Sequence, residues 1–196
     1  MMKPKKLLFS AFILVGLAQL FVPWQMIRQQ PNFAAAGAEF KFKIDSKLKE
    51  GSNHTGASIR GKFIWLEFEQ ARLKITDKKV WEPDDGVFVL FTRDSLGFAK
   101  IESVTKTKPV NNVDWVRARV WVNWRDTTTL HINYPFNQYY IKDTNPNDVE
   151  TIIKNGLNDS LKFNYLSVKI RENQFQVEDL IINEVSFKEM MKNIRH

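Results

Sequence analysis

The sequence predicts a mainly β fold, a β-rich α+β class with antiparallel sheets, one short helix and an N-terminal transmembrane helix. Three observations lead to this prediction. Several runs alternate apolar and polar residues with the period of two that half-buried strands show. Short clusters of Gly, Pro, Asn and Asp separate these runs and favour turns. A single soluble segment carries both the capping residues and the periodicity of a helix.

The N-terminal segment, residues 1–27, has the composition of a signal anchor. Lys3, Lys5 and Lys6 precede an apolar run from Leu7 to Ile27, which matches the ~20 helical residues that a bilayer core requires. The lysines are expected in the cytoplasm and the rest of the chain outside it. A cleaved signal peptide is the alternative. We therefore expect a single-pass protein of the inner (cytoplasmic) membrane, with a linker at 28–38 and an extracytoplasmic, periplasmic domain at 39–196.

Composition limits the classes of function. The 196-residue chain is 43% hydrophobic, which is enough for one good core, and it has no cysteine for disulfide or thiol chemistry. The formal net charge is +7, but without the three N-terminal lysines 26 basic residues face 22 acidic ones. This mildly basic balance is well short of a nucleic-acid footprint, so no nucleic-acid partner is expected.

The expected strands follow one another through the domain. The hairpin at Val87–Thr107 and the later one at Leu161–Lys188 share a pattern, so two similar halves are a further expectation, with chance similarity as the alternative. The runs are Glu39–Ile44, Arg60–Glu69, Ala71–Ile75, Val87–Thr92, Phe98–Thr107, Asp114–Trp124, Thr127–Tyr134, Tyr139–Ile141, Leu161–Arg171 and Phe175–Lys188.

The one expected soluble helix lies between these hairpins. Asn145 is its predicted N-cap, Pro146 its first residue and Gly156 its C-terminal stop. Its apolar stripe, which should dock on a sheet, consists of Val149, Ile152 and Ile153.

The run Arg60–Glu69 is the most hydrophobic strand candidate, and apolar residues on both of its faces predict cover from both sides. Gly61, Phe63, Leu66 and Phe68 within it have the spacing of Gly-Asp-Tyr-x-x-Leu-x-Tyr. The chain thereby resembles the bacterial GDYXXLXY family, membrane-anchored proteins without an assigned activity. Lys62 replaces the family's Asp and phenylalanine replaces both tyrosines, so the resemblance implies a packing motif. It also implies a polytopic membrane protein as partner.

A second conspicuous run, Asp114–Trp124, places Trp115, Arg117, Arg119 and Trp121 on one face. Arginines interleaved with tryptophans can bind anionic or ring-bearing ligands through stacking and cation–π contacts. The alternative is structural: each arginine covers a neighbouring ring and pairs with a cross-strand acid.

No catalytic set is recognisable in the sequence. It has no glycine-rich phosphate cradle and no helical His/Glu metal pair, so no cofactor and no metal site are expected. Carboxylates distant in the chain could still meet, which leaves an envelope hydrolase as the last-ranked hypothesis. The sequence predicts a non-enzymatic, membrane-anchored extracytoplasmic interaction module, accessory to a polytopic membrane protein. The alternative is a glycan- or lipid-binding envelope domain.

Overall fold

The computed structural model describes Gln19, Phe21 and residues 37–45, 57–60, 62–75, 81–111, 113–122, 128–141, 145–157 and 163–194. The chain divides into two compact units, Met1–Ala36 and Gly37–His196. The predicted anchor at 1–27 and the motif residue Gly61 lie outside the described residues, apart from Gln19 and Phe21. Across the described ranges, no helix combines the length and the hydropathy that crossing a membrane requires.

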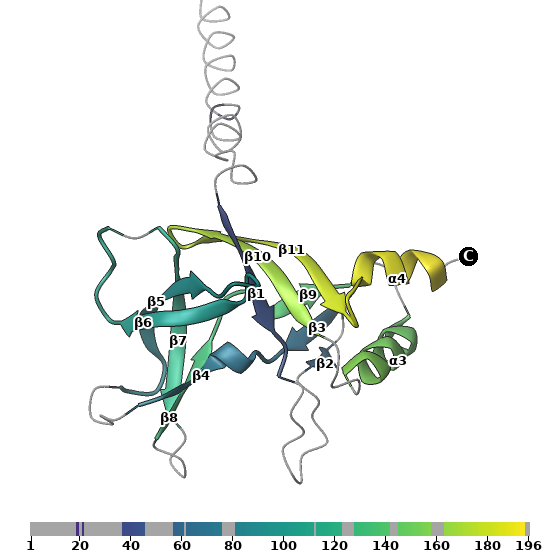
Figure 1. Cartoon of the computed structure of the whole chain (residues 1–196), viewed down its shortest axis with the longest axis horizontal. Helices are drawn as coiled ribbons and strands as arrows, with labels where there is room; N and C mark the ends of the chain where they lie inside the picture. The colour runs from purple at the N-terminus through teal and green to yellow at the C-terminus, as the bar shows by residue number, and fades with distance from the viewer. Residues whose placement is uncertain are drawn as a thin grey trace, which may run out of the picture. The chain divides into compact units, whose positions relative to one another are not determined.

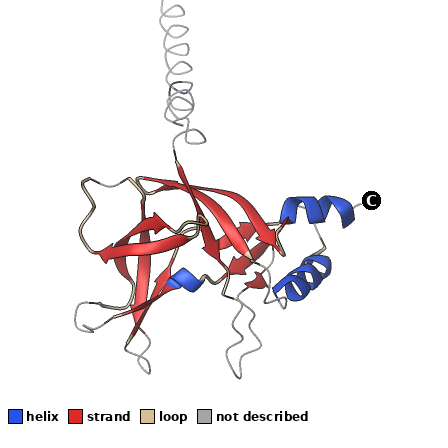
Figure 2. Cartoon of the chain, in the orientation of Figure 1, coloured by secondary structure: helices blue, strands red, loops and turns tan. Residues whose placement is uncertain are grey.

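The unit Gly37–His196 is built from three antiparallel sheets, which confirms the mainly β, antiparallel class (Figure 2). The four-stranded sheet has the order β1 (Ala38–Lys43), β10 (Tyr165–Arg171), β11 (Gln174–Ile182) and β12 (Val185–Ser186). The three-stranded sheet has the order β2 (Ala57–Arg60), β3 (Phe63–Leu66) and β9 (Gln138–Tyr140). The five-stranded sheet has the order β4 (Arg72–Lys74), β8 (Thr129–Asn133), β7 (Trp115–Val122), β5 (Asp85–Arg93) and β6 (Ala99–Thr105).

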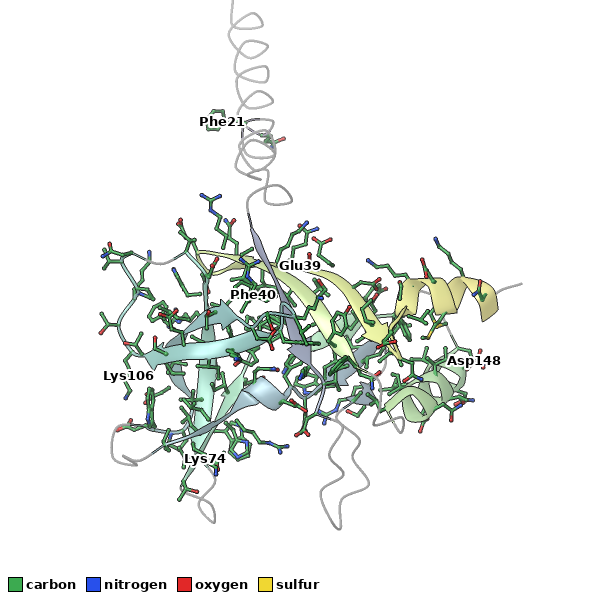
Figure 3. The ribbon with its side chains drawn as sticks, in the orientation of Figure 1. Phe21, Glu39, Phe40, Lys74, Lys106 and Asp148 are labelled. Atoms are coloured by element: carbon green, nitrogen blue, oxygen red, sulfur yellow. The ribbon has the colours of Figure 1, made fainter. Side chains whose placement is uncertain are left out.

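Strand β1 joins the sheets. It pairs fully with β10, and an isolated bridge links Lys41 to Phe98, next to β6, through the amide of Lys41 and the carbonyl of Gly97. Its alternating sequence turns successive side chains to opposite sides, as Glu39 and Phe40 do in Figure 3, and buries Phe40. A strand bonded on both sides in this way holds the sheets around one shared core.

Aromatic side chains fill that core. Phe42 is fully buried, and its ring lies 4.7 Å from Phe136, 5.2 Å from Phe91 and 5.6 Å from Phe68. Tyr134 stacks on Phe136 at 5.2 Å. The Tyr134 hydroxyl donates to the carbonyl of Gln70 at 2.8 Å, which satisfies the one polar group in this cluster.

The run Arg60–Glu69, predicted as one doubly covered strand, contains the last residue of β2 and the whole of β3, which pair antiparallel with Arg60 opposite Phe63. Strand β3 ends at Leu66, and a 3₁₀ turn (Glu69–Ala71) leads into β4. Only one face of β3 is buried, because Phe63 remains 40% exposed. The prediction of cover from both sides was wrong, since the three-stranded sheet packs on the core with one face.

The predicted helix is present as α3 (Pro146–Leu157), and Asn145 accepts a hydrogen bond from the amide of Asn147 at its start. Gly156, predicted as its stop, is the penultimate residue of the helix, which ends at Leu157, and it packs against Ile182 of β11. A second helix, α4 (Phe187–Ile194), was not predicted, because the alternating run was extended through Lys188. Figure 1 shows α3 and α4 together at one end of the unit, away from the five-stranded sheet.

Both hairpins that suggested two similar halves exist, as β5–β6 and β10–β11. They belong to different sheets, and each contains one register shift, at Leu90/Phe91 and at Ser167/Val168. A duplication of halves stays a prediction.

Candidate functional site

The exposed face of β7 is narrower than the sequence predicted. Arg117, Arg119 and Trp121 are exposed on it, while Val116, Ala118 and Val120 are buried on the other face. Trp115 is the exception and corrects the prediction: it is only 4% exposed, with its ring 5.2 Å from Phe88. The Lys108 ammonium lies 5.6 Å from the same ring, and the Asn173 amide of the β10–β11 turn donates to the Trp115 carbonyl at 2.8 Å. The surface therefore has one tryptophan from β7.

Two of these three side chains are held by neighbours. Arg119 Nη1 lies 3.0 and 2.8 Å from the two carboxylate oxygens of Asp84, an exposed ion pair. Trp121 is 46% exposed, and its ring stacks on the His131 imidazole at 4.3 Å with an interplanar angle of 16°. The structural alternative thus accounts for Arg119, whose charge is compensated across the sheet. His131 covers one face of the Trp121 indole and leaves the other face uncovered.

Two adjoining hollows lie along this surface. The first, of about 260 Å³, lies between Trp65 and Trp121, and the second, of about 690 Å³, extends from Trp65 over Arg117 to Phe175. We call the two together the groove. Both are lined by Trp65, Asn133, Tyr134 and Asn137.

The aromatic walls of the groove come from segments far apart in the chain. Trp65 belongs to β3, where the Arg60 guanidinium lies 5.1 Å from its ring. Phe175 belongs to β11, is 40% exposed, and is positioned by the ring of Phe136 at 5.6 Å. Together with Trp121 of β7, these rings give the groove three partly exposed aromatic surfaces of fixed orientation.

Side-chain amides form the polar part of the groove. The turn between β8 and β9 brings Asn133 and Asn137 together, with Asn137 Nδ2 donating to Asn133 Oδ1 at 2.6 Å. The backbone carbonyl of Asn137 accepts from the Leu66 amide, which fixes the turn against β3. This arrangement leaves two side-chain groups without a partner in the described part of the chain, the amino group of Asn133 and the side-chain carbonyl of Asn137. One donor and one acceptor are therefore available side by side.

Tyr134 lies beneath these amides. Burial raises its pKa above the ordinary value, so the phenol is neutral at physiological pH. Its hydroxyl is already bonded to Gln70. Tyr134 supports the groove and supplies no titrating group to it.

Arg117 occupies the second hollow beside Gly86. A Cβ atom at position 86 would lie 3.2 Å from Arg117 Nη2 and 3.4 Å from Nε, so the guanidinium fills the space that a side chain there would need. The Arg117 amide donates to Asn173 Oδ1 at 2.7 Å. Within the described ranges, no carboxylate forms an ion pair with the Arg117 guanidinium.

The motif residues near this groove are mostly structural. Leu66 and Phe68 are buried, and Phe68 packs in the aromatic core. Phe63 faces away from the core and pairs across the sheet with Tyr140, their rings 5.5 Å apart. Leu66 and Phe68 also reach the wall of the first hollow.

Sequence reasoning missed most of the groove, including Trp65, Gly86, the two asparagines and the hairpin residues Asn173 and Phe175. The one usable signal was the amide-rich turn Asn133-Tyr-Pro-Phe-Asn137-Gln138 after an alternating strand. No group of three or more His, Cys, Asp or Glu side chains that could hold a metal occurs in the described residues.

Comparisons with known proteins give no relative from which a function could be inferred, so the groove is the basis for the functional proposal. No protein-family model matches the chain, and neither a curated protein nor a solved structure matches it significantly. The resemblance to the GDYXXLXY family stays a prediction.

Proposed function

We propose that the unit Gly37–His196 is a non-catalytic glycan-binding module, held at the extracytoplasmic face of the inner membrane by the N-terminal segment. The observation that carries this proposal is the groove itself, which is lined by the partly exposed Trp65 and Trp121 and by a pair of asparagines with one donor and one acceptor to spare. The anchor and the location are supported by the lysine-flanked apolar run of the sequence.

The chemistry of a sugar chain matches this lining. A pyranose ring has an apolar C–H face, which packs on an indole, and a rim of hydroxyls that both donate and accept hydrogen bonds. The Trp121 ring, oriented by His131, can pack against the apolar C–H face. The amino group of Asn133 and the side-chain carbonyl of Asn137 can hydrogen-bond to the hydroxyls.

The same lining disfavours a lipid chain as the ligand. The apolar interior of the unit is filled by packed rings such as Phe42 and Phe136. The groove by contrast is lined by amides and charged groups, which would lose hydration against an acyl chain without gaining partners. We therefore place the glycan hypothesis ahead of the lipid hypothesis.

The test is calorimetric titration of the full-length chain with hexamers of glucose, N-acetylglucosamine and methyl-esterified galacturonic acid. A polyoxyethylene detergent is used, because a glycoside detergent would itself present sugar. We expect Trp121→Ala and Trp65→Ala each to weaken binding about 5- to 10-fold, the contribution of one aromatic contact.

Tyr140→Ser is the matched control, since it removes an exposed aromatic ring outside the groove. It should leave the affinity unchanged. Absence of binding to all three hexamers, or binding indifferent to both tryptophan variants, would reject the proposal.

A second candidate function, docking on a polytopic membrane protein, is favoured by a separate surface. Phe63 and Tyr140 are 40% and 52% exposed, directly opposite each other on β3 and β9. Neither lines the groove, so a protein partner could contact them while a glycan is bound. Aromatic residues are enriched in protein interfaces, and tyrosine is frequent among the residues that contribute most to binding.

Site-specific photo-cross-linking in the native membrane tests this second candidate. A photoreactive residue at position 63 or 140 should give one discrete adduct with an integral, multi-span protein. The same residue at Glu150, exposed on α3, is the control and should give none. Equal adducts from all three positions would reject a specific interface at the Phe63–Tyr140 pair.

A further inference from the structure

We infer that the groove is selective for acidic glycans, and that Arg117 receives a carboxylate of the sugar chain. This inference rests on the proposed glycan-binding function and specifies the chemical class of the ligand. It depends on the charge of the second hollow, the packing around Arg117 and the position of the acidic groups.

The charge of the second hollow is unbalanced by one unit. Its lining contains three charged residues, Asp84, Arg117 and Arg119. Asp84 is bonded to Arg119 through both carboxylate oxygens, at 3.0 and 2.8 Å. The remaining positive charge belongs to Arg117, which has no ionic partner in the part of the chain that the structure describes. A monoanionic group would neutralise it.

Gly86 determines where this charge lies. Because position 86 has no Cβ, the Arg117 guanidinium can lie within 3.2 Å of that place, inside the hollow. The bond from the Arg117 amide to Asn173 fixes the backbone beneath it. The planar fork of an arginine guanidinium suits the two oxygens of a carboxylate.

The two hollows also differ in charge. Glu67 lines the first hollow and is absent from the second, and Arg72, which lies 3.6 Å from it, is also bound to buried Asp45 at 2.7 Å. The charges that line the first hollow are therefore paired with one another, whereas, among the described residues, the second hollow has one unpaired cation that attracts an anion. A phosphate dianion would fit less well than a carboxylate, because Asp84 lines the same hollow as Arg117 and one cation cannot balance two charges.

The test compares hexagalacturonate with its methyl ester, which has the same sugars without the charge, on the full-length chain. We expect the acid to bind about 10-fold more tightly than the ester, as for one charge-assisted hydrogen bond at a partly exposed site. Arg117→Gln should abolish this preference, so that the acid and the ester bind that variant with equal affinity. Gly86→Ala should reduce the preference while the protein stays folded, because only the end of the Arg117 side chain must move.

Arg93→Gln is the control for net charge, since Arg93 is exposed on β5 outside the groove. It should retain the preference. Equal affinity for acid and ester in the wild type, or a preference that survives Arg117→Gln, would overturn the acidic selectivity and leave glycan binding standing. Displacement of the acid by millimolar inorganic phosphate, with no effect of acetate, would overturn the carboxylate assignment. Failure of the acid and of the ester to bind would overturn the acidic selectivity, and the glycan proposal would fall with it only if the hexamers of glucose and N-acetylglucosamine also failed to bind.

Discussion

Gly156→Ala should destabilise the protein by about 2–3 kcal/mol, the cost of overpacking a closed interior. Intrinsic helix propensity has the opposite sign, since alanine in a helix interior is favoured over glycine by about 1 kcal/mol. The structure reverses that sign because an alanine Cβ would lie 2.0 Å from Ile182 Cγ2, and Ile182 is itself buried. Urea denaturation of the two proteins measures the difference in the free energy of unfolding.

Asn155→Ala is the matched control, because it also adds helix propensity in α3 but at an exposed position. It should be neutral or slightly stabilising. Ile182→Ala removes the obstructing methyl group, so Gly156→Ala should cost less in that background than in the wild type. An unchanged cost in the double variant would show that contact between α3 and β11 is not the cause.

The strands and the helix of this protein could be predicted because their signals are local. The alternation of Glu39–Ile44 alone predicts a strand with Phe40, Phe42 and Ile44 inside, and all three are buried. Helix α3 was predicted from Asn145 and its apolar stripe, and the structure bears out both the cap and the burial of Val149 and Ile153.

Gly156 shows what a local signal leaves out, although helix α3 does end at the next residue, Leu157. A glycine near a helix end is usually a stop. Here it is a point of close approach to Ile182, whose position is known only from the tertiary structure.

Helix α4 was missed although the sequence contains its signature. Ser186 and Glu189 have the spacing of a capping box, and in the structure the Glu189 amide donates to Ser186 Oγ at 3.4 Å. The helix was missed because the apolar alternation of the preceding strand was extended past this start, through Lys188. The Ser186 hydroxyl is shared with Asp179 of β11, which turns the chain from strand to helix.

Of the candidate site, only the residues that belong to strand β7 could be predicted from the sequence. The alternation of β7 placed Arg117, Arg119 and Trp121 together on one face, and the structure shows them exposed. The same pattern predicted Trp115 to be exposed, but its ring is buried beside Phe88 and Lys108. Contacts between segments more than 50 residues apart, such as Arg117 with Asn173, leave no periodic trace in the sequence. Most of the residues that line the groove belong to segments other than β7.

Phe42→Ala should cause the largest loss of stability of any single change considered, about 3–5 kcal/mol. Phe42 is fully buried and lies within 5.7 Å of four other rings, those of Phe68, Phe91, Tyr134 and Phe136. Removing its ring leaves a cavity that packed aromatic neighbours cannot collapse to fill. In a protein whose total stability is of the order of 5–15 kcal/mol, such a loss is readily measured as a fall in the urea midpoint and in Tm.

Phe63→Ala makes the same chemical change within the motif, at a ring that is 40% exposed and contacts only Tyr140 among the aromatic residues described. It should cost less than about 1 kcal/mol. Equal losses from the two variants would contradict a core centred on Phe42.

The difference in stability matters for the groove, because Tyr134 and Phe136 are flanked in the chain by Asn133 and Asn137. The rings that pack on Phe42 therefore belong to the turn that holds the two asparagine amides. Phe42→Ala should lower both the stability of the protein and its affinity for the ligand, whereas Phe63→Ala should leave both nearly unchanged.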